Sequence, residues 1–420
     1  MREMKDSGIE WIGAIPAAWG VHRIASHFQE IKEKNTDNAY SNALQFKMGR
    51  IIAKPQKWDE DETNETYSAY TVVHPNTIMI NGLNLEFDFV TQRVARVECD
   101  GIITSAYIAL SPRDDINAKY ICYLFKSYDA CRAFHSMGRG LRKILSYSEL
   151  KNKPIVIPPL AEQERIAAFL DAECAEIDAV LEKTRASIEE YKKLKQAVIT
   201  QAVTKGVRGD RPMKDSGIEW IGEIPAEWDV LNLVAHTSML TPMRDRPENL
   251  DGPIPWVRIE DFEGKYIESS KAGLGVSMKT VKEMNLKVYP VGTILCTSSC
   301  IMGKCAIVSR ELVSNQRFIG IIPDRTTDKT YLYYLMTSNA ERMNFLSTGA
   351  LQANLSRSAF EHLKVHFPPY SEQQEIAAYL DDKCEKIDEL ILKKQQYITE
   401  IENYKKSLIY EYVTGKKEVV

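Results

Sequence analysis

The chain contains the same ten residues twice, and this repeat constrains its fold more than any other feature. The segment MKDSGIEWIG begins at Met4 and again at Met213, within a match of fourteen out of sixteen positions. A second pair of segments, 158–178 and 368–388, is identical at twelve of twenty-one positions. Arrays of short solenoid repeats have periods of about 20 to 50 residues, so they do not fit these long offsets. The chain is therefore predicted to consist of two tandem halves.

Composition places the chain among ordinary globular proteins with more than one domain. It has 420 residues, of which 44% are hydrophobic and 27% are charged, and this length exceeds what a single core usually serves. No apolar run is long enough to span a membrane, and the start has no signal-peptide core, so a cytoplasmic location is expected. The net charge of −4 argues against nucleic-acid binding through overall charge, although local basic surfaces stay possible.

The middle of each half has the pattern of one mixed α/β domain. These two regions are 20–156 and 229–366. Segments 116–136 and 329–346 have the apolar spacing of amphipathic helices. Four β-rich runs are predicted to be strands: NTIMI (76–80), GIITSAYIAL (101–110), GTILC (292–296) and RFIGIIP (317–323).

Each half ends in a proline pair followed by a predicted long helix. Pro158–Pro159 and Pro368–Pro369 stand where prolines favour a helix start. In the second half Ser371 and Gln374 form a capping-box pattern. In the first half Ala161 replaces the serine, so that helix start is predicted to be weaker.

Apolar residues recur at alternating intervals of four and three in both predicted helices. This spacing over more than four heptads, with charged flanks, is typical of a coiled coil. An antiparallel pair of the two helices is expected, with adjacent chain termini; the alternatives are packing on each helix's own domain or on a second copy. Gly206 and Gly415 are expected to end the helices. The seam residues are Leu170, Cys174, Ile177, Leu181, Ile188, Tyr191, Val198, Leu380, Cys384, Ile387, Ile391, Ile398, Ile401 and Leu408.

The repeated SGIEWIG segments are expected to join each helix end to a globular domain through apolar anchors. Core packing retained after a duplication fits the same residues equally well. These anchors are Trp11, Ile12 and Trp19 in the first half and Trp220, Ile221 and Trp228 in the second.

Three of the eight cysteines lie close together in CTSSCIMGKC. Cys296, Cys300 and Cys305 have a spacing that could hold zinc, but no fourth ligand is near them. Buried, reduced thiols are therefore expected rather than a metal site.

The repeated motifs resemble those of specificity subunits of type I restriction–modification systems. The resemblance rests on SGIEWIGxIPxxW and on PPLAEQxRIAxxLD, and it extends to WVRIEDFEG (256–264), TSSCIMGKCAIV (297–308) and GALQANLS (349–356). It implies an α+β fold in which an antiparallel two-helix coiled coil separates two mixed α/β target-recognition domains, with internal pseudo-twofold symmetry.

This resemblance also implies a function. Each globular domain would read one half of a bipartite site in double-stranded DNA, and the coiled coil would set the spacer. The chain would scaffold two methyltransferase subunits, and the complex would recruit restriction subunits, with no membrane partner. No catalytic, cofactor or metal site is expected on this chain; S-adenosylmethionine and ATP with Mg²⁺ would serve the other subunits.

The repeats divide the chain into six expected segments. Two are bracket segments, two are target-recognition domains and two carry the long helices. In chain order their ranges are 1–19, 20–156, 157–212, 213–228, 229–366 and 367–420.

Candidate DNA-binding residues are cations and amides, because these side chains contact phosphates and base edges. A solvated surface charge is the plainer interpretation of each one. The candidates are Lys54, Lys57, Arg139, Arg142, Lys143, Arg258, Lys304, Arg317, Gln352, Asn354 and Arg357.

Enzymatic motifs are weak in this sequence. HFPPY (366–370) lacks the Asn or Asp of an amino-methyltransferase loop, and no GxxxxGK[ST] phosphate loop is present. The segment PDRTTDK (323–329) contains the Pro-Asp of some nuclease sites without a downstream acidic-x-Lys strand. An enzyme is therefore disfavoured, and a coiled-coil adaptor that binds only proteins is the main alternative to a DNA-specificity subunit.

Overall fold

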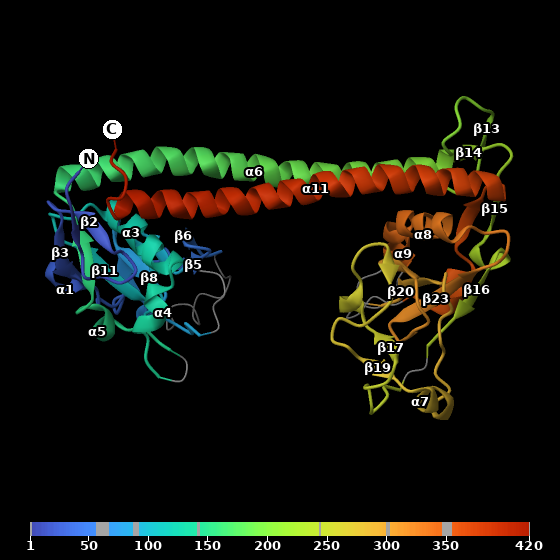
Figure 1. Cartoon of the computed structure of the whole chain (residues 1–420), viewed down its shortest axis with the longest axis horizontal. Helices are drawn as coiled ribbons and strands as arrows, with labels where there is room; N and C mark the ends of the chain where they lie inside the picture. Colours follow the sequence, from blue (N-terminus) through green and yellow to red (C-terminus); the bar gives the residue numbers. More distant parts are fainter. Residues whose placement is uncertain are drawn as a thin grey trace. The chain divides into compact units, whose positions relative to one another are not determined.

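Helices and strands are mixed along the chain, as predicted for an α+β protein (Figure 1). The computed structural model describes residues 2–55, 67–86, 92–140, 143–242, 245–299, 303–346 and 355–419. Two units form: unit 1 consists of Met1–Arg185 with Gln395–Val420, and unit 2 consists of Ala186–Lys394.

Unit 1 is built around an antiparallel sheet of four short strands in the order β4-β11-β8-β9. Their alternating apolar residues, such as Ile78, Ile80 and Leu110, are buried in its core. Four smaller pairings surround this sheet: β1 with β2, β3 with β12, β5 with β6 and β7 with β10. The strands are β1 (Met4–Asp6), β2 (Ala14–Pro16), β3 (Gly20–Arg23), β4 (Phe28–Glu30), β5 (Leu44–Lys47), β6 (Arg50–Ala53), β7 (Thr71–Val73), β8 (Ile78–Ile80), β9 (Val94–Arg96), β10 (Gly101–Ile103), β11 (Ile108–Pro112) and β12 (Pro154–Ile157).

One helix covers the sheet of unit 1. Helix α3 (Ala118–Ala130) begins at Asn117, whose side chain accepts two backbone N–H groups of the first turn. Its buried face includes Tyr120, Leu124 and Phe125, which pack into the unit 1 core. The other short helices in the described part of unit 1 are α1 (Ile24–His27), α4 (Ala133–Met137) and α5 (Tyr147–Leu150).

The beginning of α6 (Leu160–Lys205) and the end of α11 (Tyr370–Val413) pack together in unit 1. Ring centroids of Phe169 and Tyr412 lie 4.4 Å apart, and Lys405 Nζ lies 2.6 Å from Asp178. Residue numbers rise along one helix as they fall along the other, so these segments are antiparallel. The chain ends beside β1 and β2, near its own beginning (Figure 1).

Unit 2 has a five-stranded sheet in the order β16-β23-β20-β21-β18, in which only the β18–β21 pairing is parallel. A second sheet has the order β19-β17-β22, and β13 pairs with β14 and β15 with β24. The strands are β13 (Met213–Asp215), β14 (Glu223–Pro225), β15 (Asp229–Asn232), β16 (Thr237–Leu240), β17 (Ile254–Val257), β18 (Tyr266–Ile267), β19 (Gly275–Val276), β20 (Ile294–Thr297), β21 (Cys305–Val308), β22 (Val313–Ser314), β23 (Phe318–Pro323) and β24 (Lys364–Phe367).

Helix α8 (Lys329–Ser338) has the place in unit 2 that α3 has in unit 1. Asp328 caps it by accepting two backbone N–H groups, and its buried face includes Tyr331 and Leu335. Within this unit, Lys195 Nζ of α6 lies 2.6 Å from Asp388 of α11. The remaining helices are η1 (Leu233–Ala235), η2 (Ile259–Asp261), α7 (Met278–Glu283), α9 (Ala340–Leu346) and α10 (Arg357–Glu361).

Four local predictions need correction. The two predicted helices at 116–136 and 329–346 are each divided, into α3 and α4 and into α8 and α9. In unit 1 the break is at Arg132, which adopts a left-handed conformation. The run 101–110 contains two strands joined by a turn. The capping box is also wrong: α11 begins at Tyr370, so Ser371 lies inside its first turn.

The predicted seam residues share one property: each is buried or half-buried, although most of α6 and α11 around them is exposed. The buried ones are Leu170, Cys174, Leu181, Ile188, Leu380, Cys384, Ile387 and Leu408. The half-buried ones are Ile177, Tyr191, Val198, Ile391, Ile398 and Ile401. Gly206 and Gly415 both have the positive φ of helix C-caps, as predicted.

Candidate nucleic-acid interface

The repeated segments of unit 1 form a polar corner at the start of α6. Trp19 Nε1 donates to Glu162 at 3.0 Å, and the guanidinium of Arg2 lies 2.6 Å from the same carboxylate. The neighbouring Gln163 donates to the carbonyl of Pro158 and accepts the backbone N–H of Asn117. Because Asn117 caps α3, this glutamine fixes the helix of the globular part against the start of α6.

Unit 2 contains the same corner with equivalent residues. Trp228 Nε1 donates to Glu372 at 3.1 Å, and Arg211 lies 2.6 Å from that carboxylate. Gln373 accepts the backbone N–H of Asp328, the cap of α8. The sequence showed the Glu-Gln pair only as repeated letters. Its signal was that Glu-Gln recurs at the same position in both halves, between the Pro-Pro pair and Ile-Ala-Ala, although the residues next to it differ.

A tyrosine–aspartate contact reinforces each corner about two turns further along the long helix. Tyr123 donates to Asp171 at 2.8 Å, and Tyr334 donates to Asp381 at 2.7 Å. Burial raises the pKa of both tyrosines well above the usual value, and the hydrogen bonds to the carboxylates raise it further. Both hydroxyls therefore stay protonated and serve as donors in this structural contact.

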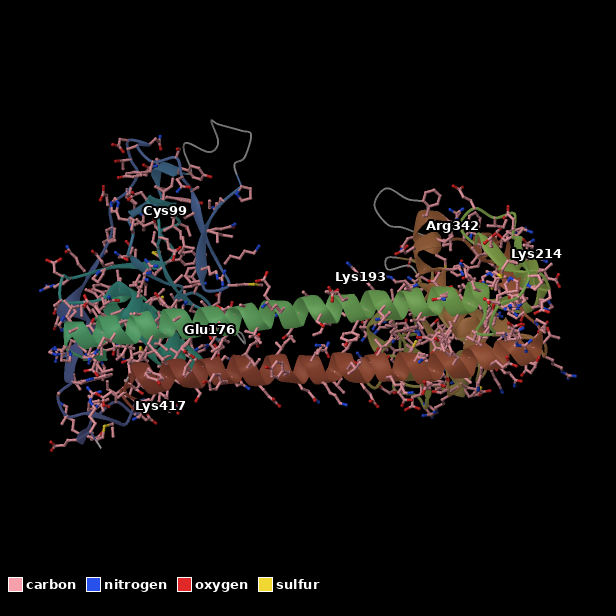
Figure 2. All side chains as sticks on the ribbon, turned by 90° about the horizontal axis from the view of Figure 1, so that it is seen from above. Cys99, Glu176, Lys193, Lys214, Arg342 and Lys417 are labelled. Atoms are coloured by element: carbon pink, nitrogen blue, oxygen red, sulfur yellow. A yellow bond between two sulfur atoms is a disulfide. The ribbon has the colours of Figure 1, made fainter. Side chains whose placement is uncertain are left out.

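The identical decapeptide is covered in unit 1. Tyr410 donates from its hydroxyl to the carbonyls of Trp11 and Ile12 at 3.2 Å each, and Lys416 Nζ donates to the carbonyl of Ile12 at 2.8 Å. The ring of Trp11 packs edge-on against Tyr128. Figure 2 labels Lys417, the next residue of this C-terminal cap.

The same ten residues are more exposed in unit 2. Trp220 is 43% exposed, and Ile218 and Ile221 are only half-buried. The guanidinium of Arg342, labelled in Figure 2, lies 3.8 Å from the ring centroid of Trp220 and 4.8 Å from that of Phe345. Phe345 is itself 77% exposed. We refer to Trp220, Arg342 and Phe345 as the aromatic patch of unit 2.

Two of the predicted DNA-binding residues of unit 2 line one cavity of about 630 Å³. Arg317 and Arg357 share it with Gln316, Ser298 and Ser299. Both arginines are exposed, although Arg357 is paired with Glu361 at 2.7 Å. Cations and neutral hydrogen-bonding groups thus meet at one concave surface. This combination can contact phosphates and base edges together.

The other two described candidates of unit 2 lie apart from this cavity lining. Arg258 is paired with Glu260 at 3.0 Å. Lys304 is exposed, with its ammonium 5.9 Å from the ring centroid of Phe262.

The predicted candidates of unit 1 are less uniform. Arg139 is exposed at a short bridge with Ile144. Lys143 lies 3.6 Å from Glu86, and Lys54 donates to the hydroxyl of Tyr70, so both have partners. Four candidates lie outside the described residues: Lys57, Arg142, Gln352 and Asn354.

Sequence reasoning missed a basic hollow in unit 1. Two adjoining cavities of about 470 and 410 Å³ share Gly49, Arg50 and Lys126 in their linings. Lys405 and Lys406 of α11 line the larger one. These cations come from a hairpin, from α3 and from α11, so only folding brings them together, and no local motif marks them.

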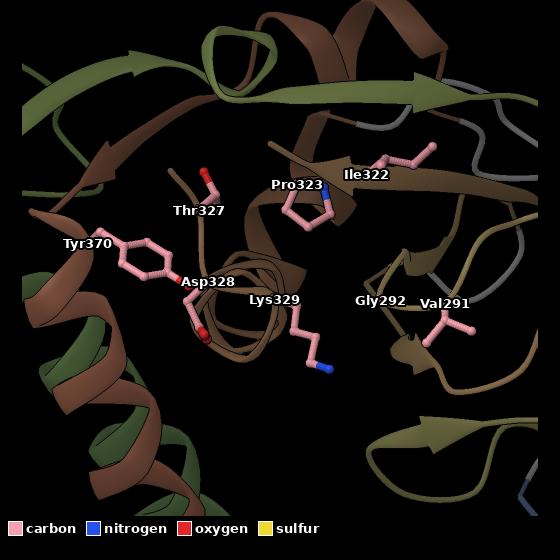
Figure 3. Close-up of a pocket in the computed structure, with 8 residues that line it drawn as sticks. All are labelled: Val291, Gly292, Ile322, Pro323, Thr327, Asp328, Lys329 and Tyr370. Atoms are coloured by element: carbon pink, nitrogen blue, oxygen red, sulfur yellow. The ribbon is translucent and has the colours of Figure 1, made fainter. Parts of the chain in front are cut away.

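A further cavity of unit 2 is lined in part by residues of the nuclease-like segment PDRTTDK (323–329) (Figure 3). Asp328, one of its lining residues, caps α8, and the ammonium of Lys329 points away from it. Asp324 accepts hydrogen bonds from Thr326. Burial alone would raise the pKa of Asp324, but these and other hydrogen bonds outweigh burial, so its pKa is below the usual value. Both carboxylates thus have structural partners. Within the described ranges, no three side chains of the metal-ligating types are grouped to hold a metal ion.

The cysteine prediction needs correction. Cys296 of β20 and Cys305 of β21 stand directly opposite each other and form a disulfide bond. Antiparallel neighbours bring two such side chains close together, which the linear spacing did not reveal. Cys300 lies outside the described residues.

No helix among the described segments is long and apolar enough to cross a membrane. The long helices α6 and α11 carry charged residues throughout their length.

The chain matches a family model described as the type I restriction modification DNA specificity domain, over residues 100–190 and 229–403. Among curated proteins, the type I restriction enzyme MjaIX specificity subunit of Methanocaldococcus jannaschii is 36% identical over 176 residues, covering 39% of this chain and 40% of that protein. The MjaVIII specificity subunit of the same organism is 24% identical over 96% of this chain and 94% of its own length.

Two solved structures share the fold along almost the whole chain. A chain from a study of complex assembly and conformational transition of the type I R-M system has a TM-score of 0.74 at 13% identity, covering 96% of this chain and 99% of that chain. The HsdS subunit from Thermoanaerobacter tengcongensis has a TM-score of 0.50 at 16% identity, covering 96% of this chain and 98% of that chain.

Proposed function

Because this chain belongs to the family of type I restriction–modification DNA specificity subunits, we propose that each of its two units reads one half of a bipartite DNA target. The observation that carries this proposal is one repeated framework with two different surfaces. The Trp–Glu–Arg corner recurs in both units. The basic hollow of unit 1 and the arginine-lined cavity of unit 2 are built from unlike residues.

The ranges 20–156 and 229–366 are the proposed target-recognition domains. Their frames are the bracket segments 1–19 and 213–228 and the helical segments 157–212 and 367–420. A common frame with different readers suits a target whose two halves have different sequences, since base contacts depend on side-chain identity.

We propose that α6 and α11 form one antiparallel coiled coil that sets the distance between the half-sites. Two observations support this: the seam residues are buried or half-buried, and the helices run antiparallel where they meet within each unit. A helix of 46 residues is roughly 70 Å long, at about 1.5 Å per residue. Half-sites on one face of a duplex lie about 34 Å apart or a multiple of it.

The repeated frames are the proposed contact surfaces for two methyltransferase subunits. The aromatic patch of unit 2, in which Trp220 belongs to the frame and Arg342 and Phe345 to the adjoining domain, is the best candidate for part of one contact. Tryptophan, phenylalanine and arginine are enriched at protein interfaces, and the guanidinium of Arg342 lies close to two exposed rings. Restriction subunits would join through the assembled complex.

This chain is proposed to catalyse no reaction and to bind no cofactor. The carboxylates of its nuclease-like segment are engaged in a helix cap and in a hydrogen-bonded turn. S-adenosylmethionine would bind to the methyltransferase subunits, and ATP with Mg²⁺ to the restriction subunits.

The test is co-expression with the methyltransferase subunit, followed by mapping of methylated bases. Methylation of a split motif is expected, because two separate readers select two short sequences. If the complex assembles but binds DNA without sequence preference, the chain is a protein adaptor and the proposal is wrong.

A second measurement examines the patch. Arg342→Glu and Phe345→Asp are expected to remove one methyltransferase subunit from the complex, as measured by native mass spectrometry. The matched control is Arg310→Glu in the same unit, on a residue outside the patch. Retention of both subunits would exclude the patch from the interface.

A further inference from the structure

The hairpin formed by β5 and β6 has an unusual tip. Lys47 and Arg50 are the last paired residues, so the turn consists only of Met48 and Gly49. Both turn residues have positive φ, +47° for Met48 and +69° for Gly49. Such turns favour Asn followed by Gly, because a side chain with a Cβ is strained in this region. A methionine is therefore a poor choice for the stability of this hairpin.

The side chain of Met48 gains nothing from burial. It is 78% exposed, whereas Leu44, at the start of the same strand, is buried in a core cluster. A flexible apolar side chain at the tip of a hairpin contributes to folding neither through the turn nor through the core. Its environment instead suits contact with another molecule.

The two residues that flank the Met48-Gly49 turn carry like charges and repel each other. Lys47 and Arg50 face each other across the hairpin, and both are exposed. Like charges directly opposite each other on two strands are destabilising. Among the described residues, no ion pair to either side chain offsets this repulsion, whereas nearby cations such as Lys119 and Lys405 have carboxylate partners. Negative charge brought to the tip from outside would turn the repulsion into attraction.

The surroundings of the tip are also basic. Met48 and Arg50 line the larger hollow of unit 1. Its lining contains five cations, Arg50, Lys126, Arg185, Lys405 and Lys406, and three carboxylates, Asp129, Asp178 and Glu402. Arg185 and Lys405 are paired with Glu402 and Asp178, so the net excess of two positive charges comes from the other three cations and Asp129. This local excess, on a chain whose net charge is −4, favours the approach of a polyanion.

We propose that the β5–β6 hairpin enters the major groove of the DNA half-site that unit 1 reads, and that Met48 contacts the C5-methyl group of a thymine there. Lys47 and Arg50 contact the flanking phosphates. A two-stranded ribbon fits the major groove, where the thymine methyl is the apolar feature that distinguishes its base pair. The inference rests on the proposed function and adds the reading element, the base and the residues.

The first test uses the chain assembled with its methyltransferase subunits and a library of random-sequence DNA duplexes. The wild type is expected to select a split motif with a thymine that the Met48→Asn variant no longer selects, while the other half-site is unchanged. Asparagine suits this turn, so the variant is expected to melt at the same or a higher temperature. Met278→Asn, at an exposed methionine of unit 2, is the matched control and is expected to keep the full motif.

Deoxyuridine replaces the selected thymine in a second measurement, because it lacks only the methyl group. The wild-type complex is expected to lose about fourfold in affinity, the value for one buried methyl group, and Met48→Asn is expected to bind both duplexes equally. An unchanged motif in Met48→Asn, or equal binding of both duplexes by the wild type, would overturn the proposal. A wild-type complex that selects no split motif would instead refute the proposed function, and this inference with it.

The phosphate contacts have a separate readout. Lys47→Ala and Arg50→Ala are each expected to weaken binding uniformly across sequences and to reduce the salt slope of the affinity by about one. Lys151→Ala, at an exposed lysine at the end of α5, is the control. If the salt slope of both hairpin variants equals that of the wild type, these cations do not contact phosphates.

Discussion

His366 shows how one residue can distinguish two otherwise equivalent positions. It lies in β24 opposite Val230, and Val156 lies in β12 opposite Val21 in the corresponding strand pair of unit 1. The side chains of His366 and Val156 are both buried. The imidazole of His366 stacks on the ring of Trp228, with centroids 5.6 Å apart. Burial lowers the pKa of His366 to about 4.

This pKa predicts acid sensitivity of unit 2. The unfolded chain binds a proton at His366 below pH about 6.5, whereas the folded chain resists it until about pH 4. Stability from this residue is therefore complete above pH 6.5 and falls as the pH is lowered, by on the order of 3 kcal/mol at pH 4. His366→Phe is expected to remove this part of the pH dependence, measured by urea unfolding between pH 4 and 7.

The matched control is His362→Phe, at an exposed histidine of the same unit. It is expected to leave the pH dependence of unfolding unchanged. A wild-type slope retained in His366→Phe would show that other groups cause the acid sensitivity.

At the scale of elements, the decapeptide separates local sequence from its environment. Its two copies have the same paired strands and the same left-handed glycines, with φ of 68° and 70° in the first copy and 69° in both glycines of the second. Local sequence therefore decides this conformation. The end of α11 covers the first copy, whereas Trp220 of the second copy is exposed. The exposure of the decapeptide therefore depends on tertiary contacts.

Gly415 is predicted to be essential for this cover. It has φ of +71°, and a Cβ placed there would approach Pro16 Cδ to 2.3 Å and the ring of Trp19 to 3.1 Å. Gly415→Ala is expected to destabilise unit 1 by about 2–4 kcal/mol, from backbone strain together with overpacking. Thermal unfolding measures the loss.

Gly217→Ala separates the two contributions to that loss. Gly217 has φ of +69° and open space around its Cα, so its substitution is expected to cost only the backbone term of about 1–2 kcal/mol. Equal losses in the two variants would mean that contact with Pro16 does not matter.

At the scale of the whole molecule, two units are built on the same polar corner and carry different surfaces. In each unit a glutamine of the long helix holds the N-cap of the domain helix, through Gln163 with Asn117 and Gln373 with Asp328. Both the beginning and the end of the chain belong to unit 1 (Figure 1). The Trp–Glu–Arg contacts of each corner lie entirely in the frame segments, so exchange of a domain leaves them intact. The glutamine contact is kept if the incoming domain supplies its own helix N-cap at the position of Asn117 or Asp328.

Exchange of 20–156 for the same region of a relative is predicted to change one half of the DNA target and to leave the other intact. The reason is that, under the proposed function, base contacts of that half-site come from the exchanged surface alone. Methylated-base mapping of the co-expressed complex measures the result. The reciprocal exchange of 229–366 is the control, and a change in both halves after either exchange would contradict separate readers.

Insertion of one heptad into both α6 and α11 is predicted to lengthen the unread spacer. Seven residues keep the seam in register, because they are one full period of the pattern, and extend each helix by about 10 Å. Sequencing of the modified sites measures the spacer. Insertion of four residues in both helices breaks the register and is the control; an unchanged spacer after the heptad insertion would exclude the helices as its determinant.

Local sequence by itself determined the duplication, the α+β class, the long helices and the glycines that end them. The duplication is visible as identical letters in the two halves. The other features follow from periodicity and backbone preference, which act within a few residues of the chain. The apolar pattern did not predict that the domain helices are divided. In unit 1 the apolar spacing continues across the left-handed break at Arg132.

Tertiary structure alone decided which side chains meet. Arg50, Lys126 and Lys405 come from three elements, the Cys296–Cys305 bond depends on strand register, and Trp11 and Trp220 differ in exposure within identical sequences. Contacts between residues far apart in sequence depend on the packing of whole elements. These contacts therefore cannot be predicted from a local sequence pattern.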